Sequence, residues 1–207
     1  MRRRWLMLGL GTASQTAACL FVYGIPYLAP ELLKAGMSLA HIGLLVACPT
    51  AGLLLTLVAW GAAADRRGER EVISLGLAIA AICLAGVPLF RSLPALGALF
   101  AVAGAASASV FAASGSLVLG WFPAGERGLA MGLRQTATPL GMGLAALLVP
   151  GLAQQRGHTG AVLFFATALG VTALAVGAFV RDPPRIRSGP PLEKPGGESG
   201  GRPQGEI

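Results

Sequence analysis

The chain has 207 residues, of which 54% are hydrophobic and only 12% are charged. Soluble domains carry about 25% charged residues, so this composition excludes an ordinary soluble domain and indicates a protein embedded in lipid. The formal net charge is +7, but the basic residues lie between hydrophobic runs and form no soluble basic face. This distribution argues against a nucleic-acid-binding protein and is typical of membrane proteins.

Six apolar runs follow one another along the chain, and each is long enough to cross a bilayer, which takes about 20 residues. The first run could be misread as a cleaved signal, but it is longer than a signal core and five more runs follow. We therefore expect an all-α membrane protein in which residues 1–182 form a bundle of six transmembrane helices. The expected helices cover residues 5–29, 39–63, 72–90, 95–122, 128–153 and 160–180, within a few residues.

The distribution of basic residues predicts the orientation of this bundle. On the assignment above, 13 of the 16 Lys and Arg residues lie on the side of the N-terminus and 3 on the other side. Because cytoplasmic loops carry an excess of Lys and Arg, both termini are expected in the cytoplasm, with the bundle in the plasma (inner) membrane. Residues 183–207, rich in Pro and Gly, are expected to form a disordered cytoplasmic tail, because they hold too few apolar residues to fold.

The stretch GAAADRRGER, residues 61–70, concentrates charge between the second and third runs. Asp65 should end the second helix, where the helix dipole disfavours an acid, so it needs a partner among the neighbouring arginines or at the N-terminus of another helix. Gly68 permits the tight reversal of the chain. The simpler interpretation is a solvated turn whose arginines only set the topology. The candidate gating residues are Gly61, Asp65, Arg66, Gly68 and Arg70.

Two patterns resemble those of the major facilitator superfamily of transporters. The spacing G-x-x-x-D-R-R-G-x-R of residues 61–70 is similar to its loop between the second and third helices, although Glu69 stands where a base is usual. The P-x-x-E-R-G-x-A-x-G pattern of residues 123–132 looks like the inner loop before its fifth helix. The resemblance implies that this chain is the N-terminal six-helix half of a twelve-helix transporter.

Such a transporter moves a small solute by alternating access between two halves, so transport would require a second half. That half would be another copy of this chain, a separate chain, or a C-terminal half missing from this sequence. In the family the acid of the first loop forms a latch with the C-terminal half at the inner side, which is the role that the resemblance implies for Asp65. The alternative is a non-transporting membrane protein, either a truncated remnant or a six-helix interaction subunit.

Polar side chains recur on one face of the first expected helix. They either make helix–helix hydrogen bonds or line a substrate cavity, and the resemblance favours the cavity, because the first and fourth helices line it in the family. The fourth expected helix contributes Ser107 and Ser114, one heptad apart, but lacks the arginine that the family links to proton coupling. The stripe on the first helix comprises Thr12, Gln15, Thr16, Cys19, Tyr23 and Tyr27.

Arg134, about two turns into the fifth expected helix, is the remaining candidate. It either snorkels to the lipid headgroups or faces the cavity. A cavity-facing arginine would suit a small anionic or carboxylate-bearing solute, and it could equally pair with an acid of the second half. The candidate substrate-binding residues are therefore Thr12, Gln15, Tyr23, Ser107, Ser114, Arg134, Gln135 and Thr138.

No arrangement of residues indicates an enzyme, a cofactor or a metal site. His41 and His158 have no acid or nucleophile at a recognisable spacing, and the three cysteines fall in different apolar runs without C-x-x-C spacing. The expected partners are the lipid bilayer, a small solute and a second six-helix half, and no nucleic acid is expected.

Overall fold

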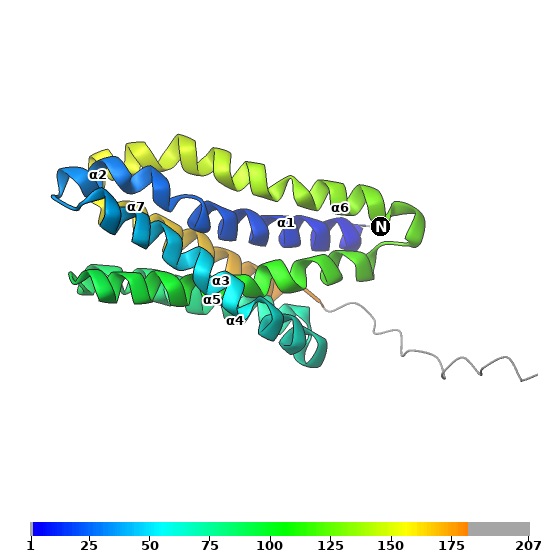
Figure 1. Cartoon of the computed structure of the whole chain (residues 1–207). Helices are drawn as coiled ribbons and strands as arrows, with labels where there is room; N and C mark the ends of the chain where they lie inside the picture. The colour runs from blue at the N-terminus through cyan, green and yellow to red at the C-terminus, as the bar shows by residue number, and fades with distance from the viewer. Residues whose placement is uncertain (1, 182–207) are drawn as a thin grey trace, which may run out of the picture.

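The computed structural model describes residues 2–181, which are helical apart from short turns. Residue 1 and residues 182–207, which include the expected disordered tail, lie outside the described residues. The longer helices are α1 (Arg2–Val22), α3 (Leu39–Arg67), α4 (Glu69–Ala85), α5 (Leu93–Trp121), α6 (Arg127–Gln135) and α7 (Ala137–Phe179), as Figure 1 shows. The short elements are η1 (Ile25–Leu28), α2 (Ala29–Lys34), η2 (Val87–Leu89) and η3 (Ala124–Glu126).

Five helical segments of the described chain are long and apolar enough to cross a membrane. The last of them covers Ala124–Phe179, and its 56 residues would measure about 84 Å as one straight helix, far more than the roughly 30 Å core of a bilayer. The segment bends at Gly157, where φ is 70° and ψ is 175°. This bend divides α7 into two lengths, so the six expected transmembrane helices are present.

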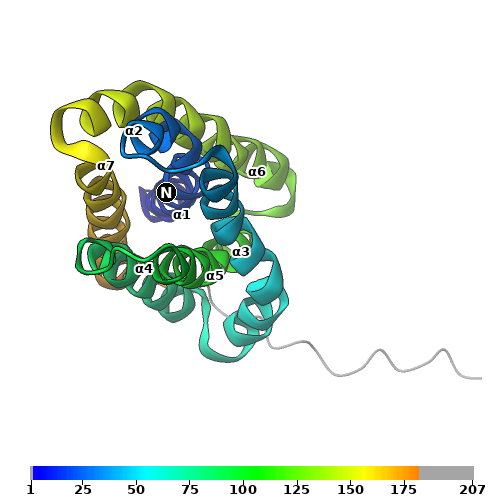
Figure 2. The ribbon, with the colours of Figure 1, turned by 60° about the vertical axis from the view of Figure 1, so that its left-hand side comes forward.

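Helix α1 lies at the centre of the bundle, with α3, α4, α5, α6 and α7 around it (Figure 2). In the apolar 18-residue stretch of α1, 67% of the residues are buried, against 22% in the corresponding stretch of α3. Phe21 of α1 lies between Phe100 of α5 and Phe165 of α7, with ring centroids 6.4 and 6.1 Å apart respectively. Because α1 is enclosed in this way, most polar side chains on it must face other helices.

Helices α3 and α5 approach each other closely through two glycines. A Cβ atom on Gly104 of α5 would lie 2.1 Å from the carbonyl oxygen of Pro49, and one on Gly52 of α3 would lie 2.0 Å from the carbonyl oxygen of Ala101. Only glycine allows the two backbones to come so near, as is common where membrane helices pack. The small residues expected on the fourth helix therefore serve close helix packing.

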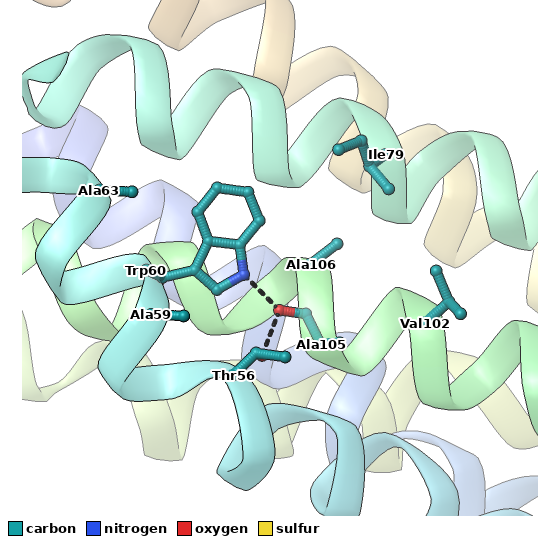
Figure 3. A pocket seen from close by; sticks show the side chains of 8 residues that line it. All are labelled: Thr56, Ala59, Trp60, Ala63, Ile79, Val102, Ala105 and Ala106. Carbon is teal, nitrogen blue, oxygen red and sulfur yellow. Dashed lines mark hydrogen bonds between the residues drawn. The ribbon is translucent and has the colours of Figure 1, made fainter.

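Further along the same helix pair, two side chains of α3 donate to one carbonyl of α5. Thr56 Oγ1 and Trp60 Nε1 bond to the oxygen of Ala105 at 2.9 and 2.7 Å, as the dashed lines in Figure 3 show. They border a surface pocket of about 420 Å³ whose other lining residues are alanines, a valine and an isoleucine. No charged group lines this pocket, so it offers little that would select a polar solute.

The expected ends of the first three helices were wrong. The first helix does not reach residue 29 but stops at Val22, because Pro26 has no N–H to donate to the carbonyl of Val22. The chain continues there as η1 and α2. The second helix does not stop at residue 63 but continues to Arg67, because no Gly or Pro lies between residue 63 and Gly68. The third helix ends at Ala85 and not at residue 90, because Pro88 has no N–H to donate to the carbonyl of Leu84.

Candidate functional site

The charged stretch of residues 61–70 is a helix end followed by a one-residue turn, and not an extended loop. Gly61, Asp65 and Arg66 lie on the last two turns of α3, while Arg70 lies on the first turn of α4. Between the two helices, Gly68 has φ 99° and ψ 156°, a conformation that is essentially restricted to glycine. The predicted reversal at Gly68 is confirmed, and the predicted length of the loop is corrected.

Asp65 is exposed and makes no hydrogen bond or ion pair with any of residues 2–181. Arg70 instead donates from Nε to the carbonyl of Gly177 in α7 at 3.0 Å, and its Nη2 bonds to the same oxygen. Arg70 thus ties the start of α4 to the last turn of α7, where cations are favoured by the helix dipole. The gating role of this stretch stays a prediction.

A second contact at the same end joins the start of α1 to the turn before α6. Arg4 Nη1 lies 2.8 Å from Glu126 Oε2, and the guanidinium of Arg4 lies over the ring of Phe122 at 5.5 Å. Trp5 packs edge-on against the same ring, with centroids 5.5 Å apart. Sequence reasoning missed this pair, because nothing local relates two residues so far apart in the chain.

Five of the eight predicted substrate-binding residues meet in one group, which we call the polar cluster; its members are buried except for the half-buried Thr138 and the exposed Gln135. Arg134 of α6 is only 7% exposed, and its Nε and Nη2 donate to Ser114 Oγ at 3.1 and 2.8 Å. Its Nη1 donates to Gln135 Oε1 at 3.2 Å. Ser114 of α5 in turn donates to Gln15 Oε1 of α1 at 3.3 Å. The polar cluster therefore connects three helices through Ser114.

Thr138 extends the polar cluster to α7. Its Oγ1 accepts from Gln15 Nε2 at 3.4 Å and from Cys19 Sγ at 3.7 Å. One turn further, a Cβ on Gly141 would lie 2.6 Å from the Cβ of Cys19, which shows how closely α7 approaches α1 here. Cys19 was not among the predicted site residues, although its position one turn after Gln15 was a signal for it.

A break in the fifth expected helix lies within the polar cluster. Residues 128–153 were expected to form one helix, but α6 ends at Gln135 and α7 begins at Ala137. Pro139 has no N–H for the carbonyl of Gln135, and the N–H of Thr136 bonds to the carbonyl of Leu133 at 3.2 Å, which is a tighter 3₁₀-type turn. Arg134 and Thr138 therefore stand on opposite sides of a joint between two helices.

The other three predicted residues lie outside the polar cluster. Thr12 lines an apolar groove of about 640 Å³ between α1, α6 and α7. Tyr23 follows the end of α1 and is 40% exposed. Ser107 is buried, but its hydroxyl donates to the carbonyl of Ala103 in its own helix at 2.8 Å. The structure thus places Ser114 and not Ser107 in contact with Arg134.

The chemistry of the polar cluster is that of a cation without a counter-charge. Arg134 makes no ion pair within residues 2–181, and a guanidinium keeps its charge in proteins. Burying a charge without a partner is costly, above all within a membrane. Arginine has five N–H donors in a fork that suits carboxylates, and the hydroxyl and amide oxygens around it carry no formal negative charge. The arrangement can therefore hold an anionic group.

Within residues 2–181, six lengths of helix that suit membrane crossing pack around the polar cluster and define a multi-pass helical membrane protein. Comparison with known proteins identifies the family. The profile of the Major Facilitator Superfamily matches residues 2–203, so the chain belongs to this superfamily, whose members are transporters and not enzymes.

Individual relatives agree with this assignment. Uncharacterized MFS-type transporters from two strains of Mycobacterium tuberculosis are each 39% identical over 183 residues, which is 88% of this chain and 41% of theirs. Probable anion transporter 4, chloroplastic, of Arabidopsis thaliana is 30% identical over 138 residues, 66% of this chain and 26% of that protein. The chain thus spans less than half the length of these relatives.

The fold agrees with half of a solved transporter. A bacterial homolog to the human lysosomal transporter Spinster, in an inward-facing and occupied conformation, matches with a TM-score of 0.84 at 20% identity. The match covers 90% of this chain and 46% of that one. The predicted fold, half of a major-facilitator-type bundle, is therefore confirmed.

Proposed function

We propose that this chain supplies the N-terminal half of a secondary transporter that moves a small anionic solute by alternating access. The observation that carries the proposal is Arg134, which is 7% exposed and has no acid paired with it in residues 2–181. The similarity to a protein named as an anion transporter supports the same substrate class. Transporters of this kind bind solute between two halves, and the chain covers less than half of its relatives.

We further propose that the bundle lies in the plasma (inner) membrane with both ends of the chain in the cytoplasm. The support is the distribution of charge, because 13 of 16 basic residues fall on one side of the bundle. Arg4, Arg66, Arg67 and Arg70 all lie at the helix ends of that side.

The purified chain should associate with a second half and be stabilised by anions. We expect its mass in nanodiscs to exceed that of one chain, through self-association or with a co-expressed six-helix half. Benzoate should raise the melting temperature and neutral benzamide should not, because only benzoate carries the negative charge that Arg134 would bind. A ligand at about 100 times its Kd adds roughly 2.7 kcal/mol of stability. Mass photometry and thermal unfolding measure the two effects.

A strict monomer that neither benzoate nor any other carboxylate stabilises would contradict the half-transporter proposal. That result would favour the alternative, a six-helix membrane protein that interacts with partners but moves no solute. Stabilisation by benzamide equal to that by benzoate would leave association intact but overturn the anionic substrate class.

For Asp65 we propose a latch with the second half at the cytoplasmic side. It is exposed at the end of α3 and has no partner in residues 2–181, which leaves its carboxylate available to donors of another half. The C-terminal end of a helix is an unfavourable place for an acid, by about 0.3–1 kcal/mol. A helix N-terminus of the second half would reverse that effect.

Asp65→Asn keeps the shape of the side chain and removes its charge, so it should loosen the closed state without lowering expression. In the assembled transporter, we expect a cysteine introduced at the exposed Ala124 to be labelled from the cytoplasmic side about two to five times faster. Glu71→Gln, which removes an exposed acid from the neighbouring helix end, is the matched control and should change nothing. Equal labelling rates in Asp65→Asn and wild type would show that residues 61–70 set the membrane topology and do not form a latch.

A further inference from the structure

A pocket of about 380 Å³ lies at the end of the bundle opposite the N-terminus. It is bordered by α2, by the turn that contains η2, and by the first residues after the Gly157 bend in α7. In Figure 1 this is the end that carries α2, far along the helices from the N-terminus. The volume lies within the range of about 300–1,000 Å³ that is usual for ligand pockets. Nothing in the proposed transport mechanism uses this pocket.

The polar side chains that line the pocket are basic or neutral. Arg91 and His158 contribute nitrogen donors and Thr159 contributes a hydroxyl, and no acid is among the lining residues. None of these three side chains makes a hydrogen bond or ion pair with residues 2–181. Glu31, the acid of α2, is already bonded to Lys34 at 2.7 Å. The pocket therefore presents positive charge that this half does not neutralise.

The rest of the pocket is apolar. Leu32, Val87 and Leu96 line it, and the same three side chains border a smaller cavity of about 20 Å³ that reaches toward Phe100 in the core. A ligand that fits both parts needs a charged head and an aliphatic body. Ligand sites commonly combine apolar walls with a few polar groups that orient the ligand.

We propose that this pocket binds an amphipathic anion, with its oxyanion head against Arg91 and His158 and its aliphatic body against Leu32, Val87 and Leu96. Two sources share this chemistry, namely a free aliphatic carboxylate and an anionic membrane lipid. The pocket is separate from the polar cluster, because α6, the helix that carries Arg134, lies toward the end of the bundle that holds the N-terminus (Figure 1).

Binding of radiolabelled octanoate to the full chain in nanodiscs of phosphatidylcholine tests the proposal, with octanol as the neutral comparison. Arg91→Gln should weaken octanoate binding by about tenfold or more, because charge-assisted hydrogen bonds contribute most to holding a carboxylate. Octanol should bind about tenfold more weakly than octanoate. Because Arg91 is exposed, its replacement should leave the melting temperature unchanged.

Two control variants separate this pocket from other basic sites. Arg156 is an exposed base beside the same bend, but it does not line the pocket. Arg156→Gln should therefore change the affinity for octanoate by less than about twofold. Arg134→Gln should leave the Arg91-dependent part of the binding in place, so failure of the proposed function and failure of this inference are distinguishable.

A second arm replaces part of the lipid with phosphatidylglycerol. If a membrane lipid is the occupant, this lipid will compete with octanoate and will co-purify with the wild type but not with Arg91→Gln. If a free carboxylate is the occupant, octanoate binding will persist in its presence. The inference is overturned if octanoate and octanol bind equally, or if neither octanoate binding nor lipid retention depends on Arg91.

Discussion

Gly104→Ala should force α5 away from α3 and lower the free energy of unfolding by about 3 kcal/mol, the upper part of the usual range for overpacking. The added methyl would lie 2.1 Å from the carbonyl oxygen of Pro49 and 2.4 Å from its Cα. Both are backbone atoms, so no side-chain rotation can relieve the contact. The helix pair must therefore separate along its length. Unfolding by sodium dodecyl sulfate in mixed micelles measures the loss.

Gly43→Ala is the matched control for this prediction. A Cβ at Gly43, on the same α3 helix, would meet nothing within 4 Å, so the substitution should be neutral or should stabilise the helix by up to about 1 kcal/mol. Equal stability of Gly104→Ala and wild type would show that the two backbones are not in contact, and the arrangement of α3 against α5 would have to be revised.

Arg134→Gln should weaken the binding of benzoate by the assembled transporter while the bundle keeps its fold. Glutamine places its amide nitrogen near the position of Arg134 Nε, which donates to Ser114 in the wild type at 3.1 Å, but it carries no charge. Loss of charge-assisted hydrogen bonds of about 1.5–3 kcal/mol corresponds to roughly a 10- to 100-fold lower affinity. Equilibrium binding of benzoate, together with the melting temperature, measures both parts of this prediction.

Arg134→Lys separates the charge from the shape of the guanidinium. Lysine keeps a positive charge but cannot form the planar fork, so its affinity should fall between those of the wild type and Arg134→Gln. If Arg134 instead pairs with an acid of the second half, Arg134→Gln will weaken the association of the two halves. Benzoate affinity that is unchanged in Arg134→Gln, in an intact assembly, would make Arg134 a structural residue.

Much of the fold was predictable because a membrane helix is a local feature. In lipid each backbone N–H and C=O must be satisfied within its own segment, so a long apolar run is by itself enough to indicate a helix. The ends were less predictable. Pro26 explains why α1 stops at Val22, but whether the chain then forms a loop or continues as η1 and α2 depends on what it packs against.

The predicted site was partly found in the same way. Helical spacing placed Gln15 and Cys19 on one face of the first helix, and both reach Thr138. The same spacing put Tyr23 on that face, yet it is 40% exposed beyond the end of α1. Periodicity indicates which side chains share a face, but not how far along that face a neighbouring helix extends.

Composition, hydropathy and charge determined by themselves that this chain is a bundle of membrane helices, because these properties act on one segment at a time. Only the tertiary structure decided that Ser114, and not Ser107 one heptad before it, accepts the hydrogen bonds of Arg134. It also decided that Pro139 breaks the fifth expected helix at the centre of the polar cluster. The partners of a buried polar group depend on the distance and the rotation between packed helices. Both are set by close contacts at glycines, such as that of Gly141 with Cys19, between residues that are distant in sequence.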